Sequence, residues 1–331
     1  MTPYIVHLTP SLQDHEQDLS QNLGDIIIYK SIEPILIELF PNTEIIKLST
    51  HDYLESNHIR LIKKAQHTFV GGSNLLSSNI NQYNQWKYSK SRWDYFFPNI
   101  TNINLIGVGW WQYQHAPTFK TAHFYKSLFS KKKKLSVRDS YTLKQLQQCG
   151  IKNVINTSCP TTWNLNGIKT NKTQQVSSCL FSLTDYNPAP VLDNALIELL
   201  AASYHQLFFF PQGSKDIEYI NILSNFIKYK NKIIIIERNI EAASTLLSNY
   251  KQDLNYIGTR LHLGIYCLQY KIPSLIISID NRAFEIAKDI NLPVVERHEI
   301  AKIKEWINNA SPESSIHIPL NAINDWKQQF K

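Results

Sequence analysis

The residues best suited to acid–base and anion chemistry lie in one short segment, Gly258-Thr259-Arg260-Leu261-His262. The run 254–257 before it predicts a strand, and the run 261–270 after it predicts a helix. A guanidinium such as that of Arg260 binds carboxylates and phosphates through parallel N–H groups. The helix dipole disfavours the imidazolium form of His262 at a helix start, which suits a general acid or base near neutral pH. The segment therefore predicts a site that binds an anion and transfers a proton, with a purely structural turn as the alternative.

Two more arginines follow predicted strands. Arg138 comes directly after the run 134–137 and just before a predicted helix, and Arg282 follows the run 274–279. A guanidinium at the end of a buried strand is costly unless it meets a carboxylate or a phosphate. An internal ion pair between Arg138 and its neighbour Asp139 is the alternative. Together with Arg260, these side chains predict a site for a small polyanion.

Glycine turns at other predicted element ends are candidate ligand-binding loops. Glycine permits tight turns and a close approach of the backbone to a ligand. The candidate residues in these loops are Asn22, Gly24, Asp25, Gly71, Gly72, Ser73, Gly107 and Gly109. Asp25 is also a candidate helix N-cap, and each loop read alone is equally compatible with an ordinary turn. None has the spacing of a dinucleotide fingerprint or of a P-loop.

The elements that must position these residues alternate between strand and helix along the whole chain. Strands are predicted over residues 4–8, 44–48, 68–70, 104–108, 134–137, 154–156, 177–183, 206–210, 232–237, 254–257, 274–279 and 294–295. Strands separated by helices form parallel sheets. A polar, turn-rich stretch over 163–175 divides two such series and predicts a linker. The predicted fold class is α/β, with two Rossmann-like domains facing a cleft in the GT-B-like manner.

We expect the first domain to span 1–167 and to lie on the acceptor side. The second should span 175–331, carry the donor side and include the C-terminal helix. Because ligands bind at the carboxyl ends of parallel strands, the active site is expected in the cleft between the domains.

Composition narrows the class of protein. The chain has 331 residues, of which 43% are hydrophobic and 18% charged, as in packed globular domains. No leader peptide and no apolar run of about 20 residues is visible, so a cytoplasmic location is expected. The four cysteines have no metal-binding or disulfide spacing and predict buried, reduced thiols. A formal charge of +7 suits an anionic partner, and contact with an anionic membrane is a hypothesis. No nucleic-acid-binding motif and no metal-binding motif is visible.

The order of these segments resembles the polysaccharide pyruvyl transferase family. The resemblance covers about residues 4–297 and is carried by NxGD, GG, GxG, VRD, CPT, GxRLH and a late Asp-containing loop. These correspond to residues 22–25, 71–72, 107–109, 137–139, 159–161, 258–262 and 280–282. VRD and GxRLH are specific in combination, whereas the glycine turns are not.

The resemblance implies a phosphoenolpyruvate-dependent transferase that needs no cofactor or metal and forms a pyruvate ketal on a sugar. The sugar would belong to a surface polysaccharide or to its lipid-linked precursor. Under this reading Arg138 holds the phosphate or carboxylate of the donor, His262 is the acid/base, and Arg260, Arg282 and Gly258 bind the donor. Arg282 stands where the family usually has a lysine, which keeps the charge but loses a transferable proton. Ser73 replaces the third glycine of the family's usual GGG turn.

Two other functions fit the same scaffold. A GT-B glycosyltransferase would use a nucleotide sugar and would need a base-binding pocket in place of clustered cations. A glycan-binding protein without catalysis would keep its function when His262 is removed.

Overall fold

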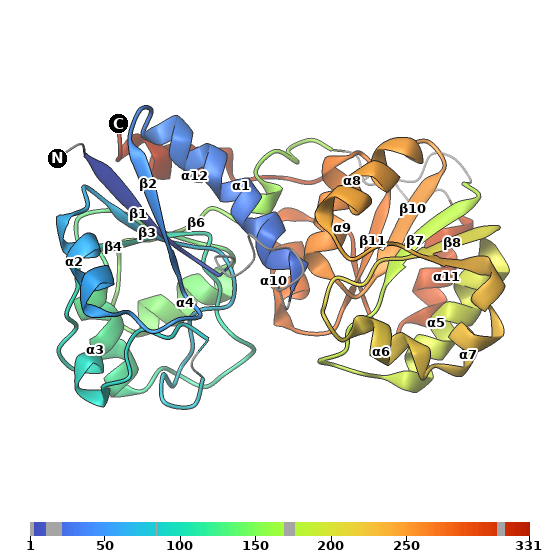
Figure 1. The fold of residues 1–331 in the computed structure, drawn as a ribbon, viewed down its shortest axis with the longest axis horizontal. Coiled ribbons are helices and arrows are strands. Elements are labelled where there is room, and N and C mark those ends of the chain that lie inside the picture. Colours follow the sequence, from blue (N-terminus) through green and yellow to red (C-terminus); the bar gives the residue numbers. More distant parts are fainter. Residues whose placement is uncertain (1–2, 11–21, 84, 169–175, 310–314) are drawn as a thin grey trace. The chain divides into compact units, whose positions relative to one another are not determined.

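The computed structural model describes residues 3–10, 22–83, 85–168, 176–309 and 315–331. They form two compact units (Figure 1). Unit 1 contains the described residues within 3–10, 28–163 and 318–331, and unit 2 those within 22–27 and 164–317. The first helix, α1 (Leu23–Leu39), therefore contributes its first turn to unit 2 and the remainder to unit 1.

Unit 1 alternates strands with helices. Its strands are β1 (Tyr4–Thr9), β2 (Glu44–Ser49), β3 (Thr68–Gly71), β4 (Ile103–Ile106), β5 (Leu135–Val137) and β6 (Val154–Asn156). Its helices, besides α1, are α2 (Ser56–Lys64), α3 (Phe119–Leu128), α4 (Ser140–Gln148) and α12 (Leu320–Gln328), with short 3-10 turns η2 (Arg92–Tyr95) and η3 (Pro160–Thr162).

All strand pairs of unit 1 are parallel. Four strands have the order β2-β1-β3-β4, and β5 pairs with β6. A parallel bridge between Val108 and Val137 links the two groups. Because β1 has β2 on one side and β3 on the other, the chain reverses its direction of winding between β1 and β3. The carboxyl ends of these strands are where such sheets bind ligands.

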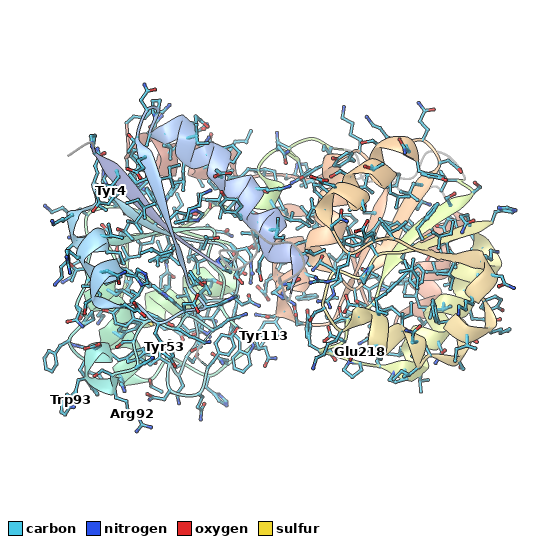
Figure 2. The ribbon with its side chains drawn as sticks, in the orientation of Figure 1. Tyr4, Tyr53, Arg92, Trp93, Tyr113 and Glu218 are labelled. Atoms are coloured by element: carbon cyan, nitrogen blue, oxygen red, sulfur yellow. The ribbon has the colours of Figure 1, made fainter. Side chains whose placement is uncertain are left out.

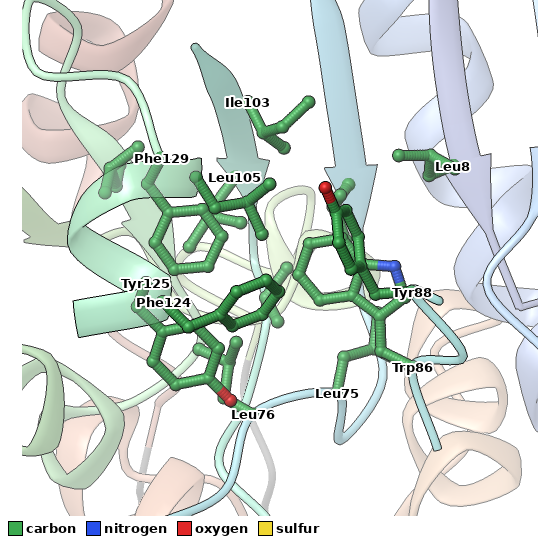
Figure 3. Packing of buried hydrophobic residues seen from close by; sticks show 14 of the residues in the cluster. Leu8, Leu75, Leu76, Trp86, Tyr88, Ile103, Leu105, Phe124, Tyr125 and Phe129 are labelled. Atoms are coloured by element: carbon green, nitrogen blue, oxygen red, sulfur yellow. The ribbon is translucent and has the colours of Figure 1, made fainter. Parts of the chain in front are cut away.

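The larger core of unit 1 is rich in aromatic side chains. Tyr88, Phe124, Tyr125 and Phe129 pack with Trp86 beside aliphatic residues of β3 and β4 (Figure 3). A smaller core lies under α1 and includes Trp326 of α12, whose side chain is fully buried against Phe69 and Trp163. Burial of these large rings supplies the main stabilisation of the sheet that positions the loops.

Unit 2 repeats the same alternation. Its strands are β7 (Ser178–Ser182), β8 (Gln206–Phe209), β9 (Ile233–Ile235), β10 (Leu254–Gly258), β11 (Ser274–Ser278) and β12 (Val294–Glu296). Its helices are α5 (Pro190–Ser203), α6 (Asp216–Asn221), α7 (Ser224–Lys228), α8 (Ile240–Asn249), α9 (Leu261–Gln269), α10 (Asn281–Ile290) and α11 (Ile300–Asn308), with a 3-10 turn η4 (Lys230–Lys232).

The unit 2 sheet is parallel throughout, in the order β12-β11-β10-β7-β8-β9. Helices cover both faces of this sheet (Figure 1). Its direction of winding reverses between β7 and β10, so the loops after these two strands flank the expected ligand position.

The structure confirms the predicted α/β class, and each predicted strand is present with its ends shifted by at most two residues. Residues 216–228 have helical periodicity in the sequence, yet the structure divides them into α6 and α7, because the break lets Leu223 and Phe226 reach the core. Asp25 lies in the first turn of α1 and is not its cap, since the side-chain oxygen of Asn22 accepts from the Gly24 amide at 3.1 Å. Residues 169–175 of the predicted linker lie outside the described part of the chain.

Two segments group differently from the expected boundaries 1–167 and 175–331. Residues 22–27 belong to unit 2, where the Leu23 amide donates to the Gln212 carbonyl at 3.1 Å. The C-terminal helix α12 belongs to unit 1, because Trp326 fills the core beside Trp163. Both differences come from contacts between residues far apart in the sequence.

Candidate functional site

The glycine turns of unit 1 hold the backbone in conformations that other residues rarely adopt. Gly72 and Gly107 have φ values of 64° and 60°, and Ser73 shares this left-handed conformation with φ of 58°. A Cβ on Gly107 would lie 2.1 Å from Cδ of Pro160, so glycine is required there. The Ser73 carbonyl accepts from the Gly109 amide at 2.8 Å, which joins the turns after β3 and β4 at one edge of the sheet.

Arg138 lies at this edge, directly after β5, with a side chain only 1% exposed. Its Nη2 donates to Oδ1 of Asn74 at 2.8 Å, and its Nε donates to Oδ2 of Asp139 at 3.2 Å. Nη1 is buried and has no hydrogen-bond partner among the described residues. The guanidinium packs on Gly109, where a Cβ would lie 2.2 Å from Nη2. A buried N–H without a partner costs about 1–3 kcal/mol, so this guanidinium has one unused donor suited to an anion.

Asp139 serves both Arg138 and the next helix. Its Oδ1 accepts from the Thr142 amide at 2.7 Å and caps α4. Gly150, which follows the C-cap residue Cys149 of this helix, has φ of 78°, as is common for a glycine that ends a helix. The nearby thiol of Cys159 has a pKa raised by burial, so it is protonated and is not a nucleophile. All four cysteines are buried and free, as predicted.

His7, on β1, lies behind the Gly71 turn. Its Nε2 would be 2.5 Å from a Cβ on Gly71, and this atom has no hydrogen-bond partner in the described parts of the chain. Burial, together with the nearby Lys47 ammonium, lowers the pKa of His7 to about 4. The His7 ring is therefore neutral near pH 7. Sequence reasoning missed this residue, which lies beside the Gly71 turn.

In unit 2, Arg260 connects the loops that follow three strands. It occupies the N-cap position of α9 after β10, is 3% exposed, and donates from Nη2 to Oδ1 of Asp185 at 2.8 Å. Its Nε donates to Oδ2 of Asp216 at 3.0 Å, and its Nη2 also pairs with Asp216. A Cβ on Gly213 would meet Nη2 at 2.1 Å. Arg260 is thus paired with two carboxylates and fixes the positions of the loops around it.

The buried Asp216 carboxylate depends on these contacts. Burial raises its pKa, while the Arg260 guanidinium and the Gly213 amide act in the opposite direction. The amide of Gly213 donates to Oδ2 at 2.7 Å. The loop 210–216 that carries these residues reads in the sequence as an ordinary turn, yet it supplies the main partner of Arg260.

Arg282 joins Arg260 around one tyrosine ring. Its Nε donates to Oδ2 of Asp280 at 2.9 Å, and its Nη2 donates to the hydroxyl of Tyr186. The Arg260 and Arg282 guanidinium carbons lie 5.1 and 5.7 Å from the centre of the Tyr186 ring. The structure therefore brings these two predicted arginines together, and Tyr186, which is 53% exposed, is their shared neighbour.

His262 is the second residue of α9 and is 4% exposed. A Cβ on Gly24 would lie 3.3 Å from its Nδ1 and 2.8 Å from Nε2 of Gln212. Asn22 accepts from Gln212 Nε2 at 2.8 Å and pairs its backbone with Gly213. The Asn22–Asp25 turn and His262 therefore meet in unit 2, although they are far apart in the sequence.

Gly258 lets β10 approach β7 closely. A Cβ there would lie 2.6 Å from the Ser182 hydroxyl and 2.7 Å from the Ser182 amide. The same hydroxyl bonds to that of Tyr256 at 2.7 Å, and the Tyr256 hydroxyl donates to the Arg260 carbonyl at 2.8 Å. Gly258 therefore has a packing role that holds the first turn of α9.

The residues that sequence reasoning missed lie at the same two edges. They are Asn74 and His7 in unit 1, and Asp185, Tyr186, Gln212 and Asp216 in unit 2. Asp185 and Tyr186 follow β7, the strand at which the winding of the unit 2 sheet reverses, and that position is the signal that would have found them. Among the described residues, no group of three or more His, Cys, Asp or Glu side chains is placed to hold a metal ion.

Comparison with solved structures places the fold. The structure of S. aureus MnaA with UDP matches with a TM-score of 0.53 and 10% identity, over 93% of this chain and 89% of that chain. LpCGTa in complex with UDP matches with a TM-score of 0.43 and 9% identity, over 99% and 94% of the two chains. The first likeness shows a GT-B-like α/β fold with parallel sheets. A search of curated proteins gave no match.

The family model for polysaccharide pyruvyl transferase matches residues 22–281, more than half of the chain. The matched region includes the Asn22–Asp25 turn, Arg138 and the Gly258–His262 segment. The chain belongs to the polysaccharide pyruvyl transferase family, and membership indicates a transferase.

Proposed function

We propose that this chain transfers the pyruvyl group of phosphoenolpyruvate to a sugar of a surface polysaccharide or of its lipid-linked precursor, forming a pyruvate ketal. Family membership supports the reaction class. The observation that carries the choice of donor is the buried Arg138 guanidinium, whose Nη1 has no partner among the described residues. A phosphate or carboxylate oxygen would satisfy this donor.

The proposed reaction balances as follows. His262 donates a proton to the methylene carbon of phosphoenolpyruvate, which becomes the methyl group and leaves an oxocarbenium-like carbon. A sugar hydroxyl attacks this carbon, the C–O bond to phosphate breaks, and a second hydroxyl closes the ketal. Of the two hydroxyl protons released, one returns to His262 and the other leaves with phosphate. Fixed charges around the developing cation would supply much of the rate.

The ion pairs of unit 2 refine the expected roles of the other arginines. Arg260 is already engaged by Asp185 and Asp216, and Arg282 by Asp280. We propose that Arg260 is a positioning residue that holds the first turn of α9, and hence His262. Arg282 would contact the donor together with Tyr186, because both side chains are partly exposed. The glycine turns at 71–73 and 107–109 would admit the acceptor.

We also propose that the reaction takes place in the cytoplasm, at the inner face of the membrane. The free, buried cysteines fit a reducing compartment. None of the described helices is long and apolar enough to cross a bilayer.

The test is phosphate release from phosphoenolpyruvate in the presence of candidate glycosides, with the ketal product verified by mass spectrometry. His262→Ala should lower turnover by about 10²–10⁴-fold, the range for a lost general acid or base. Arg138→Ala should abolish phosphoenolpyruvate binding. The exposed residues His205 and Arg60 provide matched controls, and His205→Ala and Arg60→Ala should behave as the parent.

Turnover by His262→Ala near the parent rate would exclude the proposed acid/base. A protein that turns over nucleotide sugars and leaves phosphoenolpyruvate unchanged would be a glycosyltransferase instead. Glycan binding without turnover, unaffected by His262→Ala, would indicate a binding protein.

A further inference from the structure

Four aromatic side chains of unit 1 form an exposed surface that the proposed chemistry does not use. The exposed fractions are 73% for Trp93, 38% for Phe96, 73% for Phe97 and 86% for Phe119. We call these four side chains the aromatic surface. Trp93 projects away from the ribbon beside Arg92 (Figure 2). Single exposed apolar residues are common, but a group of large rings marks an interaction site.

The aromatic surface is held by a rigid base. Ser91 caps the 3-10 turn η2 by accepting from the Trp93 amide at 3.3 Å, and the Phe97 amide donates to the Trp93 carbonyl at 3.0 Å. Tyr95, in the same turn, points inward, where its ring centre lies 5.0 Å from that of Phe124. Because Tyr95 occupies the inward position of this turn, its neighbours Trp93 and Phe96 project outward.

Helix α3 completes the surface. A ring nitrogen of His123 lies 2.9 Å from the Phe96 carbonyl, and the His123 ring stacks on Phe119 at 6.5 Å. Lys120 Nζ lies 4.8 Å from the centre of the Phe96 ring. The Trp93 and Phe96 ring centres are 6.5 Å apart. The two segments of the chain that carry the exposed rings are therefore joined through His123 and Lys120.

Basic residues lie next to the aromatic residues in the sequence. Lys90 and Arg92 are exposed, and Lys120 covers one ring. The acid within η2, Asp94, is half-buried and accepts from the Ser89 hydroxyl. Exposed tryptophan and phenylalanine beside lysine and arginine match the interface of an anionic bilayer, where rings enter the headgroup region and cations meet lipid phosphates.

We propose that the aromatic surface docks unit 1 onto an anionic lipid membrane. Trp93, Phe97 and Phe119 would enter the headgroup layer, and Lys90, Arg92 and Lys120 would face the phosphates. The basic rim favours a lipid surface over a second copy of this chain, because two such rims would repel each other. The segments that carry the surface follow β3 and β4, the strands whose carboxyl ends carry the glycine turns of unit 1. A lipid-linked acceptor in the same bilayer would then lie beside unit 1.

This last consequence rests on the proposed function, whereas membrane binding itself does not. Membrane binding is tested by co-sedimentation of the full chain with vesicles of phosphatidylglycerol and phosphatidylcholine. Vesicles of phosphatidylcholine alone are the reference. We expect binding only to the anionic vesicles, and weaker binding at higher salt because exposed charges are screened. Trp93→Ser/Phe97→Ser should reduce binding at least tenfold. Lys90→Gln/Lys120→Gln should reduce it by about 25-fold, given about fivefold for each cation.

A matched control is Ile222→Ser in unit 2, which removes an apolar side chain that is 71% exposed and lies outside the aromatic surface. It should bind vesicles as the parent does. Parent binding to neutral vesicles alone, no vesicle binding, or equal binding by Trp93→Ser/Phe97→Ser would each overturn the proposal. A parent dimer in sedimentation velocity that Trp93→Ser/Phe97→Ser converts to monomer would assign the surface to self-association instead. Phosphate release with a water-soluble acceptor, unchanged in these variants, separates loss of docking from loss of the proposed transferase activity.

Discussion

Each unit has arginine side chains at one edge of a parallel sheet, but the two edges differ in how completely these arginines are paired with carboxylates. In unit 1, glycine turns and Arg138 meet at the edge, and the guanidinium has one carboxylate neighbour, Asp139, and one unused N–H. In unit 2, Arg260 is enclosed by Asp185 and Asp216, and Arg282 is paired with Asp280. One fold therefore gives one edge that can still accept an anion and another whose guanidinium groups are already paired with carboxylates.

The comparison shows that an arginine at a strand end has two distinct uses. With a single carboxylate and an orphan donor, it is prepared for a ligand. With two carboxylates, of which Asp216 is buried, the arginine holds loops in place, and its removal exposes the cost of burying that charge.

The largest expected difference is in stability. Arg260→Met leaves Asp216, whose side chain is 0% exposed, without its cation and should lower the free energy of unfolding by about 3–5 kcal/mol. Arg138→Met should cost about 1–3 kcal/mol, because it breaks a single carboxylate contact of 3.2 Å, whereas Arg260 pairs with two carboxylates. Both losses of stability can be measured by chemical denaturation, with hydrogen exchange used to monitor unfolding in each unit. Equal losses would remove the proposed distinction, and Arg260→Lys is the conservative control.

A pH effect should appear in unit 1 and should depend on His7. Its folded pKa of about 4 lies below the unfolded value of 6.5, so the unfolded chain binds more protons between these pH values. The free energy of unfolding should therefore have its full value above pH 6.5 and fall by about 3 kcal/mol as the pH drops to 4. Hydrogen exchange of the β1 amides at pH 4.5 and pH 7 measures this. His7→Gln should flatten the dependence, and an unchanged pH slope in that variant would refute the assignment.

Two glycine substitutions, one at the sheet edge of each unit, test how strongly turnover depends on each edge. In Gly109→Ala the new Cβ would displace the Arg138 guanidinium, and turnover should fall by about 10²-fold. In Gly24→Ala the nearest contact is the flexible end of Gln212, so a loss of about tenfold is expected as His262 shifts slightly. Gly167→Ala is the control for backbone strain without a steric contact, because Gly167 has φ of 72° and no atom of the described residues lies within 4 Å of its Cβ position. A larger loss in Gly24→Ala than in Gly109→Ala would reverse the ranking.

The smallest expected effect is at Ser73. Its φ of 58° is easier for glycine, so Ser73→Gly should raise the free energy of unfolding by less than about 1 kcal/mol. Thermal denaturation is sensitive enough for this comparison. A clear loss of stability would show that the Ser73 side chain contributes contacts that outweigh the backbone preference.

Most of the fold was predictable because its signals are local. Apolar runs and helical periodicity place the strands, and the Asp139 cap and Gly150 stop mark α4. The grouping of Asn22 with Gln212 was not predictable, because 190 residues separate them. A local pattern cannot encode a contact of that range.

The same limit applies to the site. Arg138, Arg260, Arg282 and His262 stand out because polar residues at strand ends are conspicuous. The partners of Arg260 do not, since Asp185 is 75 residues away and Asp216 is 44 residues away. Which carboxylate neutralises which cation follows from strand order in the sheet, which the sequence does not state.

The four buried thiols make this chain convenient to label. Burial raises the pKa of Cys149 to about 12, and it also raises the pKa of Cys159 and Cys267. Maleimides and other thiolate-directed reagents should therefore leave the native protein unmodified at neutral pH. A single cysteine introduced at an exposed position would be the preferred attachment point, so a fluorophore or spin label could follow either unit without first removing the natural cysteines.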